Sequence, residues 1–374
     1  FMARLSDGER MTDLCKEFGI SRQAGYKLRA RYERDGACAM RDASRRPRSS
    51  PQRTLKTVMS EVLRLRKKRP TWGPKKLKAR LHDLHPEGSW PAASTIGAML
   101  KDEGLVKGRS RNRRSKATPT PLRNATAPNE LWCMDYKGEF RLGNRQYCYP
   151  LTVTDQRSRF LLACEALEGT RTGPTQEAFL EVFREYGLPS AIRSDNGAPF
   201  ASTGRMGLSK LAVWLMRLGI ELERIVPGHP EQNGRHERMH LTLKQDTTRP
   251  AGNNFLQQQE KFDVFRQVFN EERPHEALSM KPPSSVYQVS ERRLPEELEP
   301  LQYPLHDHTR PVAQNGSLHL IGVGHVYIGA ALAGENIDLR QLEEGTWLVT
   351  FMDLDFGYLD TETRKIIDRP TTLN

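Results

Sequence analysis

Three acidic residues lie where a folded protein does not normally place charges. Asp135 stands at the end of an apolar run that begins at Leu131, Asp195 directly follows a short apolar run, and Glu237 belongs to a long helical segment. A carboxylate at the end of a buried strand is costly unless it is paired or liganded, and clustered hard oxygens are the ligands that Mg²⁺ and Mn²⁺ prefer. Two such ions about 3.5–4 Å apart activate an attacking oxygen and stabilise the leaving oxygen of a phosphodiester. The three acids therefore predict in-line phosphoryl transfer, provided that the fold brings them together.

The elements around these acids have the order of an α/β domain. Strands are predicted at Leu131–Tyr136, Tyr147–Asp155 and Phe160–Ala166, then a helix at Pro174–Tyr186, a strand at Ala191–Ser194, a helix at Ser209–Leu218, a strand at Glu221–Val226 and a long helix from about Glu231 to Thr248. This order is typical of a mixed sheet. If the first and fourth strands are neighbours, Asp135 and Asp195 lie side by side, and the last helix brings Glu237 over them.

Residues 9–32 predict a helix-turn-helix module. Apolar residues recur at helical spacing from Met11 to Phe18, a break follows at Gly19-Ile20, and Ser21 can cap a second helix. In such modules the second helix enters the major groove of DNA. Its outward residues would be Arg22, Gln23, Lys27 and Arg29, which include types that pair with base edges. The alternative is a helical hairpin whose basic face is only solvated.

The pattern repeats after residue 54, which predicts a second module. Apolar residues from Val58 to Leu65 share one helix face, Trp72-Gly73-Pro74 opens a helix that carries Lys75 and Lys76, and a third helix runs from Ser94 to Gly104. Both lysines are candidate DNA contacts. The alternative for this module is a helical spacer without groove contact.

The charge of the chain is unevenly distributed. The 374 residues carry a net charge of +12, with +18 in residues 1–130 and −6 in the rest. Two basic segments without hydrophobic periodicity, residues 41–54 and 107–127, read as linkers, and the second is expected to become ordered on DNA phosphates. In the second, the candidate contacts are Arg109, Arg111, Arg113 and Arg114. A basic amino-terminal third on an acidic body predicts a DNA-binding arm attached to a domain with another task.

The remaining segments predict a helical extension and a small β domain. A helix is expected over Phe255–Asn270, and residues 308–374 contain short strand-like runs between Gly and Asp turns, typical of a small antiparallel β-barrel. Acidic residues in this segment leave DNA contact and protein contact open. The five cysteines form no Cys-x-x-Cys pair, and the longest uncharged stretch is too polar to span a bilayer, which predicts a cytoplasmic protein without structural zinc.

Five ordered segments give the sequence a specific resemblance. They are WCMDYKG (132–138), VTDQRSRF (153–160), SDNGAPF (194–200), PGHPEQNGRHER (227–238) and NEERPHEALSMKPPSSVY (270–287). Together they resemble the catalytic core of bacterial insertion-sequence transposases of the DDE type, relatives of the retroviral integrases. The resemblance implies a ribonuclease H-like fold over residues 128–250, with Asp135 and Asp195 as metal ligands and the third acid on the last core helix.

The resemblance leaves two candidates for the third acid. The commonest interval of the family, 35 intervening residues, leads from Asp195 to Glu231, whereas the Gly-x-x-Glu motif leads to Glu237. We choose Glu237, because residues 201–207 look like an insertion that lengthens the interval. Glu231 then reads as a charge stabilised by the helix N-terminus.

Other residues of the motifs receive less definite roles. Lys244 lies two helical turns after Glu237, and the resemblance implies that it grips the transferred DNA end. The histidines near the site are expected to make phosphate or structural contacts rather than to bind metal, and these are His229, His236 and His240. Asp155 is interpreted as a structural partner of Arg157 or Arg159. The segment Arg273–His275 either packs against the core or contacts DNA.

The fold class predicted from all of this is multidomain α and α/β. The expected boundaries are helix-turn-helix modules at 1–40 and 55–106, linkers at 41–54 and 107–127, a core at 128–250, a helical extension at 251–307 and a β-barrel at 308–374. The expected function is a DNA transposase, associated with the bacterial nucleoid, that binds terminal inverted repeats and uses two Mg²⁺ or Mn²⁺ ions for DNA cleavage and strand transfer. It would act as at least a dimer, because two DNA ends must be paired. The alternative is a sequence-specific DNA-binding regulator with an inactive core.

Overall fold

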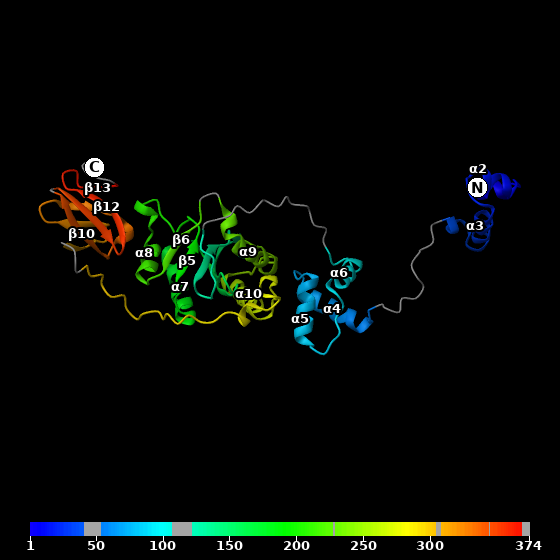
Figure 1. Cartoon of the computed structure of the whole chain (residues 1–374), viewed down its shortest axis with the longest axis horizontal. Helices are drawn as coiled ribbons and strands as arrows, with labels where there is room; N and C mark the ends of the chain where they lie inside the picture. The colour runs from blue at the N-terminus through cyan, green and yellow to red at the C-terminus, as the bar shows by residue number, and fades with distance from the viewer. Residues whose placement is uncertain (41–53, 107–121, 227–228, 304–307, 344, 369–374) are drawn as a thin grey trace. The chain divides into compact units, whose positions relative to one another are not determined.

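The computed structural model describes residues 1–40, 54–106, 122–226, 229–303, 308–343 and 345–368 (Figure 1). The chain divides into two compact units, residues 1–56 and 57–374. Most of the two predicted basic linkers, including Arg109, Arg111, Arg113 and Arg114, lies outside the described residues.

The first unit contains the predicted helix pair. It comprises α1 (Met2–Ser6), α2 (Met11–Glu17), α3 (Arg22–Asp35) and the 3-10 turn η1 (Gly36–Met40). The Ser21 side chain caps α3 by accepting a hydrogen bond from the Ala24 amide at 3.1 Å, as predicted. Gly25 lies where α2 and α3 pack, and a Cβ there would come within 2.6 Å of the Cys15 sulfur. Any other residue would require the Cys15 and Met11 side chains to shift.

The second predicted module is also helical. It consists of α4 (Lys56–Lys68), α5 (Pro74–Leu84) and α6 (Ala93–Asp102). One apolar cluster joins the three helices, built from Val62, Leu65, Trp72, Leu77, Leu81, Ile96 and Leu100. Pro74 occupies the first turn of α5, where a missing N–H costs nothing.

A mixed six-stranded sheet forms the centre of the α/β segment. The strands are β1 (Leu131–Tyr136), β2 (Phe140–Arg141), β3 (Tyr147–Asp155), β4 (Leu161–Leu167), β5 (Ala191–Ser194) and β6 (Glu221–Arg224). Their order is β2-β3-β1-β5-β6, with β4 paired to β3. The β1–β3 and β3–β4 pairs are antiparallel, whereas β1–β5 and β5–β6 are parallel. The prediction of a mixed sheet is confirmed.

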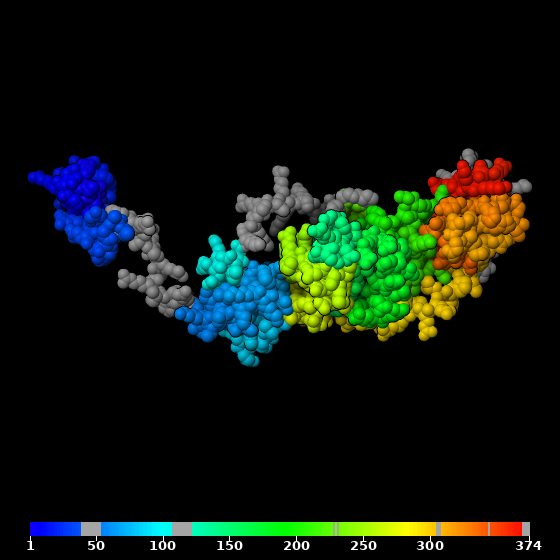
Figure 2. All heavy atoms as spheres, turned by 180° about the vertical axis from the view of Figure 1, so that it is seen from behind, coloured from blue at the N-terminus to red at the C-terminus, as the bar shows by residue number. Residues whose placement is uncertain are grey.

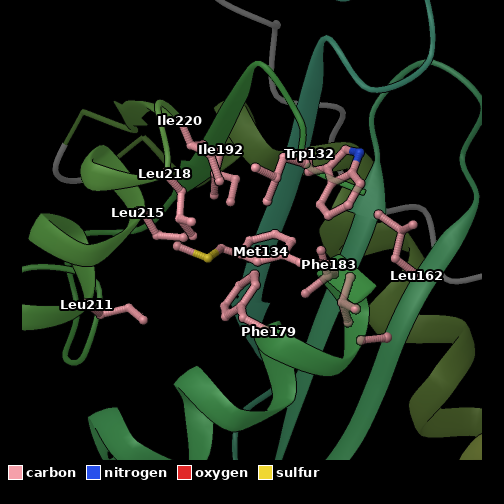
Figure 3. Packing of buried hydrophobic residues seen from close by; sticks show 14 of the residues in the cluster. Trp132, Met134, Leu162, Phe179, Phe183, Ile192, Leu211, Leu215, Leu218 and Ile220 are labelled. Carbon is pink, nitrogen blue, oxygen red and sulfur yellow. The ribbon is translucent and has the colours of Figure 1, made fainter. Parts of the chain in front are cut away.

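Helices cover both faces of this sheet (Figure 1). On one face, α7 (Thr172–Tyr186) and α8 (Lys210–Arg217) pack on Trp132 and Met134 of β1 (Figure 3). On the other face lie α9 (Gly234–Thr247) and α10 (Phe255–Gln267), which pack through Met239, Leu243 and Phe262. Successive residues of a strand point to opposite faces, so Cys133 and Asp135 are directed to the α9 face.

The carboxy-terminal segment differs from the prediction of a barrel. Its strands are β7 (His308–Pro311), β8 (Ser317–Leu320), β9 (Gly324–Tyr327), β10 (Asn336–Glu343), β11 (Thr346–Phe351), β12 (Leu354–Asp360) and β13 (Lys365–Ile367), with the 3-10 turn η7 (Ala330–Leu332). Among the described residues they form an open sheet, β13-β12-β11-β10-β7, and a separate β8–β9 hairpin. This segment is the orange to red part of Figure 2.

The open sheet has a physical explanation. The edge strands β7 and β13 are only four and three residues long, so they offer few backbone groups for closure. The apolar face of the sheet is buried instead against the hairpin and against Ala212 and Val213 of α8. Since this packing already removes the face from water, no barrel is needed to bury it.

Candidate active site

The register of β1 and β5 brings two of the predicted acids together. Cys133 of β1 pairs with Arg193 of β5 in parallel, and two residues further on the same register sets Asp135 beside Asp195. Both therefore lie at the carboxyl ends of neighbouring strands. The Asp195 carboxylate is oriented by the Gly197 amide, which donates to its Oδ1 at 3.1 Å.

Glu237 comes from the neighbouring helix α9. It lies in the first turn of α9 and is exposed. The pKa of the Asp135 carboxyl is raised to about 7. Burial is the largest cause, and the charges of Asp195 and, to a smaller extent, Glu237 add to it. The structure thus places the three acids in one electrostatic cluster.

The cluster is suited to a hard divalent ion although it is not a closed cage. Among the described residues, no three His, Cys, Asp or Glu side chains are packed tightly enough to enclose a metal ion. Mg²⁺ usually keeps several waters and binds through one or two carboxylates together with substrate phosphates. This open set of carboxylates has such donor chemistry. Burial and then the charges of Asp195 and Glu237 raise the pKa of Asp135, and a bound cation would offset the repulsion.

Two of the predicted histidines are structural. His236 and His240 are buried in α9, and each ring Nε2 lies 2.7 Å from the Thr152 hydroxyl of β3. That hydroxyl donates to the backbone oxygen of Asp135 at 3.1 Å, so both imidazoles must donate to it from Nε2. Burial lowers the pKa of His236 to about 3 and that of His240 to about 2, which keeps both rings neutral. This network locks α9 onto β1 at the position of Asp135.

We expect Thr152→Val to destabilise the core by roughly 2–4 kcal/mol, because two buried imidazole donors lose their common acceptor. Thr152→Ser keeps the hydroxyl and should cost on the order of 1 kcal/mol, that of a buried methyl group. Thermal unfolding of the full chain, followed by near-ultraviolet circular dichroism, measures the difference. Equal losses in the two variants would show that the hydroxyl does not hold the histidines.

The other predicted site residues are distributed along the chain. Lys244 is exposed in the last turn of α9, two turns after Glu237. In α3, the predicted contacts Arg22, Gln23, Lys27 and Arg29 are all exposed, and Arg29 pairs with Glu33 at 2.7 Å. In α5, Lys75 pairs with Glu276 at 2.5 Å, and Lys76 is half-buried, which lowers its pKa to about 8. His229 is exposed, before α9.

Asp155 has a structural role in the turn between β3 and β4. It is fully buried, and its carboxylate accepts hydrogen bonds from the Ser158 amide and hydroxyl and from the Asn129 amide. The expected partner Arg157 donates instead to the Thr126 backbone oxygen at 2.9 Å. The bonds to Asp155 therefore hold the end of β3 rather than a substrate.

Sequence reasoning missed the role of Thr152, which bonds to side chains 84 and 88 residues away. The alternation Thr152, Thr154 in a strand and the spacing of His236 and His240 by four residues were the available signals. No helix among the described residues combines the length and the apolar character needed to cross a membrane.

Comparison with known proteins places this site in a recognised type of domain. Two family models described as integrase core domain match residues 125–230 and 218–283, and a model described as homeodomain-like domain matches residues 24–100.

Two relatives are proteins of bacterial insertion elements. The 31.7 kDa protein of insertion element IS407 from Burkholderia multivorans is 28% identical over 208 residues, which are 55% of this chain and 73% of that protein. The 39.2 kDa protein of insertion element IS476 from Xanthomonas euvesicatoria is 26% identical over 208 residues, 55% of this chain and 58% of that protein. A solved intasome of simian T-cell lymphotropic virus, in complex with PP2A regulatory subunit B56 gamma, aligns with a TM-score of 0.40 at 17% identity, covering 75% of this chain and 94% of that one.

Proposed function

We propose that the chain, which belongs to the DDE-type transposases of bacterial insertion sequences and has an integrase-like core, binds the terminal inverted repeats of its own element and joins their 3′ ends to target DNA. The observation that carries the proposal is the placement of Asp135 and Asp195 at the ends of neighbouring strands, with Glu237 close enough to raise the pKa of Asp135. An enzyme of this type is a polynucleotidyl transferase.

Asp135, Asp195 and Glu237 would hold two Mg²⁺ or Mn²⁺ ions, which supply activation of the attacking oxygen and neutralisation of charge on the leaving oxygen. The chain's own contribution is position. Thr152 fixes the backbone of Asp135, and the Gly197 amide orients the carboxylate of Asp195. Lys244, exposed on the same helix as Glu237, would bind a phosphate of the transferred end as a point charge.

The amino-terminal helices would supply recognition of the repeats. The exposed residues of α3, among them Arg22, Gln23 and Lys27, can reach base edges if α3 lies in the major groove. The second module, α4 to α6, would contact an adjacent stretch of the same repeat. Because two ends must be joined in one reaction, we propose at least a dimer on DNA.

The test is a joining assay with the purified full chain. The substrate is labelled duplex DNA that carries one end of the chain's own element, with a plasmid as target and Mg²⁺ or EDTA in the buffer. We expect joined products that depend on the metal and on the repeat sequence, with junctions at the repeat end. Repeat-specific binding without any product would support a DNA-binding regulator instead, and cleavage that ignores the repeat and joins nothing would indicate a nuclease.

A further inference from the structure

A basic cavity lies beside the carboxylate cluster on the α9 face of the sheet. Its volume is about 660 Å³, within the range of sites for small ligands. The core residues of its wall include Cys133, Arg159, Arg235, Arg273 and His275. Asp135, Asp195 and Glu237 do not line it, whereas His236, which bonds to Thr152 and Thr154, does.

The positive charge in this cavity is not neutralised by its acids. The Asp155 carboxylate is occupied by Ser158 and Asn129, and Glu276 pairs with Lys75. Among the described residues no ion pair joins Arg159 or Arg235 to a carboxylate, and the Asp155 charge only partly offsets the lowering of the Arg159 pKa by burial and by Arg235.

The arginines that face the cavity crowd one another. Burial, and next the charge of Arg235, lower the pKa of Arg159 to about 10. Arg273 is held in place by the Thr242 hydroxyl, to which its Nη2 donates at 3.3 Å, and by the Phe269 ring, whose centre is 5.8 Å from the guanidinium carbon. These contacts fix the guanidinium group. The charge of Asp246 acts on it and partly opposes the lowering of its pKa by burial, but no ion pair joins the two among the described residues.

A second observation points to a ligand. The Nε2 atom of His275 is buried and has no hydrogen-bond partner among the described residues. A buried polar atom without a partner costs about 1–3 kcal/mol, so proteins keep such atoms mainly where something else binds. Burial lowers the pKa of His275 to about 3, so the ring is neutral and can donate from Nε2 to an anionic oxygen.

The cavity is also close to the reacting centre. Cys133, in its wall, precedes Asp135 by two residues on the same face of β1, which is about 7 Å along the strand. Gly234, the first residue of α9, lines it as well, so the positive end of a 14-residue helix points to the same region.

We propose that Arg159, Arg235 and Arg273 form a binding site for a backbone phosphate of the DNA strand, close to the bond that is cut, with His275 as an additional donor. Guanidinium groups bind phosphate oxygens in bidentate fashion, and no base edge is needed for such a contact. The site would position the strand, not read its sequence. This inference rests on the proposed function, because it assigns the anion to DNA.

The test neutralises the phosphate and the arginines separately. Duplexes of the element end carry one methylphosphonate at successive positions around the cut, and binding of the full chain in EDTA is measured by fluorescence anisotropy. We expect one position within a few nucleotides of the cut at which the neutral linkage weakens wild-type binding about tenfold. At that position the double variant Arg159→Gln/Arg235→Gln, already about tenfold weaker, should lose nothing further.

Two control variants separate the effect of the cavity arginines from a general loss of charge and from misfolding. Arg184→Gln removes an exposed charge from α7, outside the cavity, and should respond to the methylphosphonates as the wild type does. Arg235→Gln alone changes an exposed side chain, so we expect it to fold as the wild type does and to show part of the effect. Equal sensitivity of the double variant and the wild type at every position would overturn the inference.

A third arm separates DNA from a free anion. If inorganic phosphate raises the thermal stability of the wild type but not of the double variant, while DNA binding is unchanged by the substitutions, the cavity takes small anions and the inference is wrong. Failure of the joining assay with the predicted phosphate effect intact would remove the proposed transposition but not the phosphate site.

Discussion

Replacement of Glu237 by Gln should reduce DNA cleavage and strand transfer on the order of 10³-fold, a loss typical of removing one group that stabilises charge in the transition state. The substitution keeps the shape of the side chain but removes its charge. Glu237 is exposed in the first turn of α9 and contributes to the raised pKa of Asp135, so its charge is felt at the cluster. Single-turnover joining of a pre-cut element end in Mg²⁺ measures the loss.

The matched control is Glu231→Gln, at the position that the commonest family interval selects. Glu231 belongs to the 3-10 turn Pro230–Asn233, one element before α9. We expect the joining rate of this variant to stay within about threefold of the wild-type rate, since a charge at a helix N-terminus contributes only about 0.3–1 kcal/mol. A loss in Glu231→Gln that matches or exceeds the loss in Glu237→Gln would reverse the assignment of the third acid. Unchanged anisotropy with repeat DNA would show that both variants still bind.

The core was predictable because its strands are buried on both faces. The predicted bounds of β1, β3 and β5 agree with the structure, since continuous apolar runs such as Leu131–Met134 end at turn signals or at a polar residue. The placement of Asp135 and Asp195 followed from a single assumption, that β1 and β5 are neighbours. Local sequence patterns predict the strands, but whether Asp135 and Asp195 lie together depends on the order of the strands in the sheet.

The barrel prediction failed because local sequence patterns indicate strands but not how a sheet closes. Short strands separated by Gly and Asp turns indicate antiparallel structure, but closure depends on whether β7 and β13 meet, which no local pattern records. The contacts of Thr152 and the cavity of Arg159 and Arg273 join distant parts of the chain, which one sequence cannot show.

Removal of the Asp135 charge should stabilise the metal-free protein at alkaline pH. The pKa of this carboxyl is raised from 3.8 to about 7 in the folded chain, so between these values the folded state holds a proton that the unfolded state has lost. Stability therefore falls as the pH rises from about 4 to about 7. Asp135→Asn removes this penalty, and in EDTA it should be more stable than the wild type by roughly 2–4 kcal/mol at pH 8 but nearly equal to it below about pH 4.

The difference between variant and wild type isolates this carboxyl from the buried histidines. Burial lowers the pKa of His236, His240 and His275, so these rings make stability rise with pH up to about 6.5, in the wild type and in the variant alike. Asp353→Asn, an exposed control, should leave the pH profile unchanged.

The same two proteins can also be compared with and without Mg²⁺. At pH 8 it should raise the melting temperature of the wild type, because a cation offsets the repulsion among Asp135, Asp195 and Glu237, and it should have little effect on Asp135→Asn. A pH profile that is the same for Asp135→Asn and the wild type, together with an equal response to Mg²⁺, would show that the three acids do not share one site. The repulsion from Asp195 and Glu237 adds to the cost of burying the Asp135 carboxylate, and it is the part of that cost that a bound cation would offset.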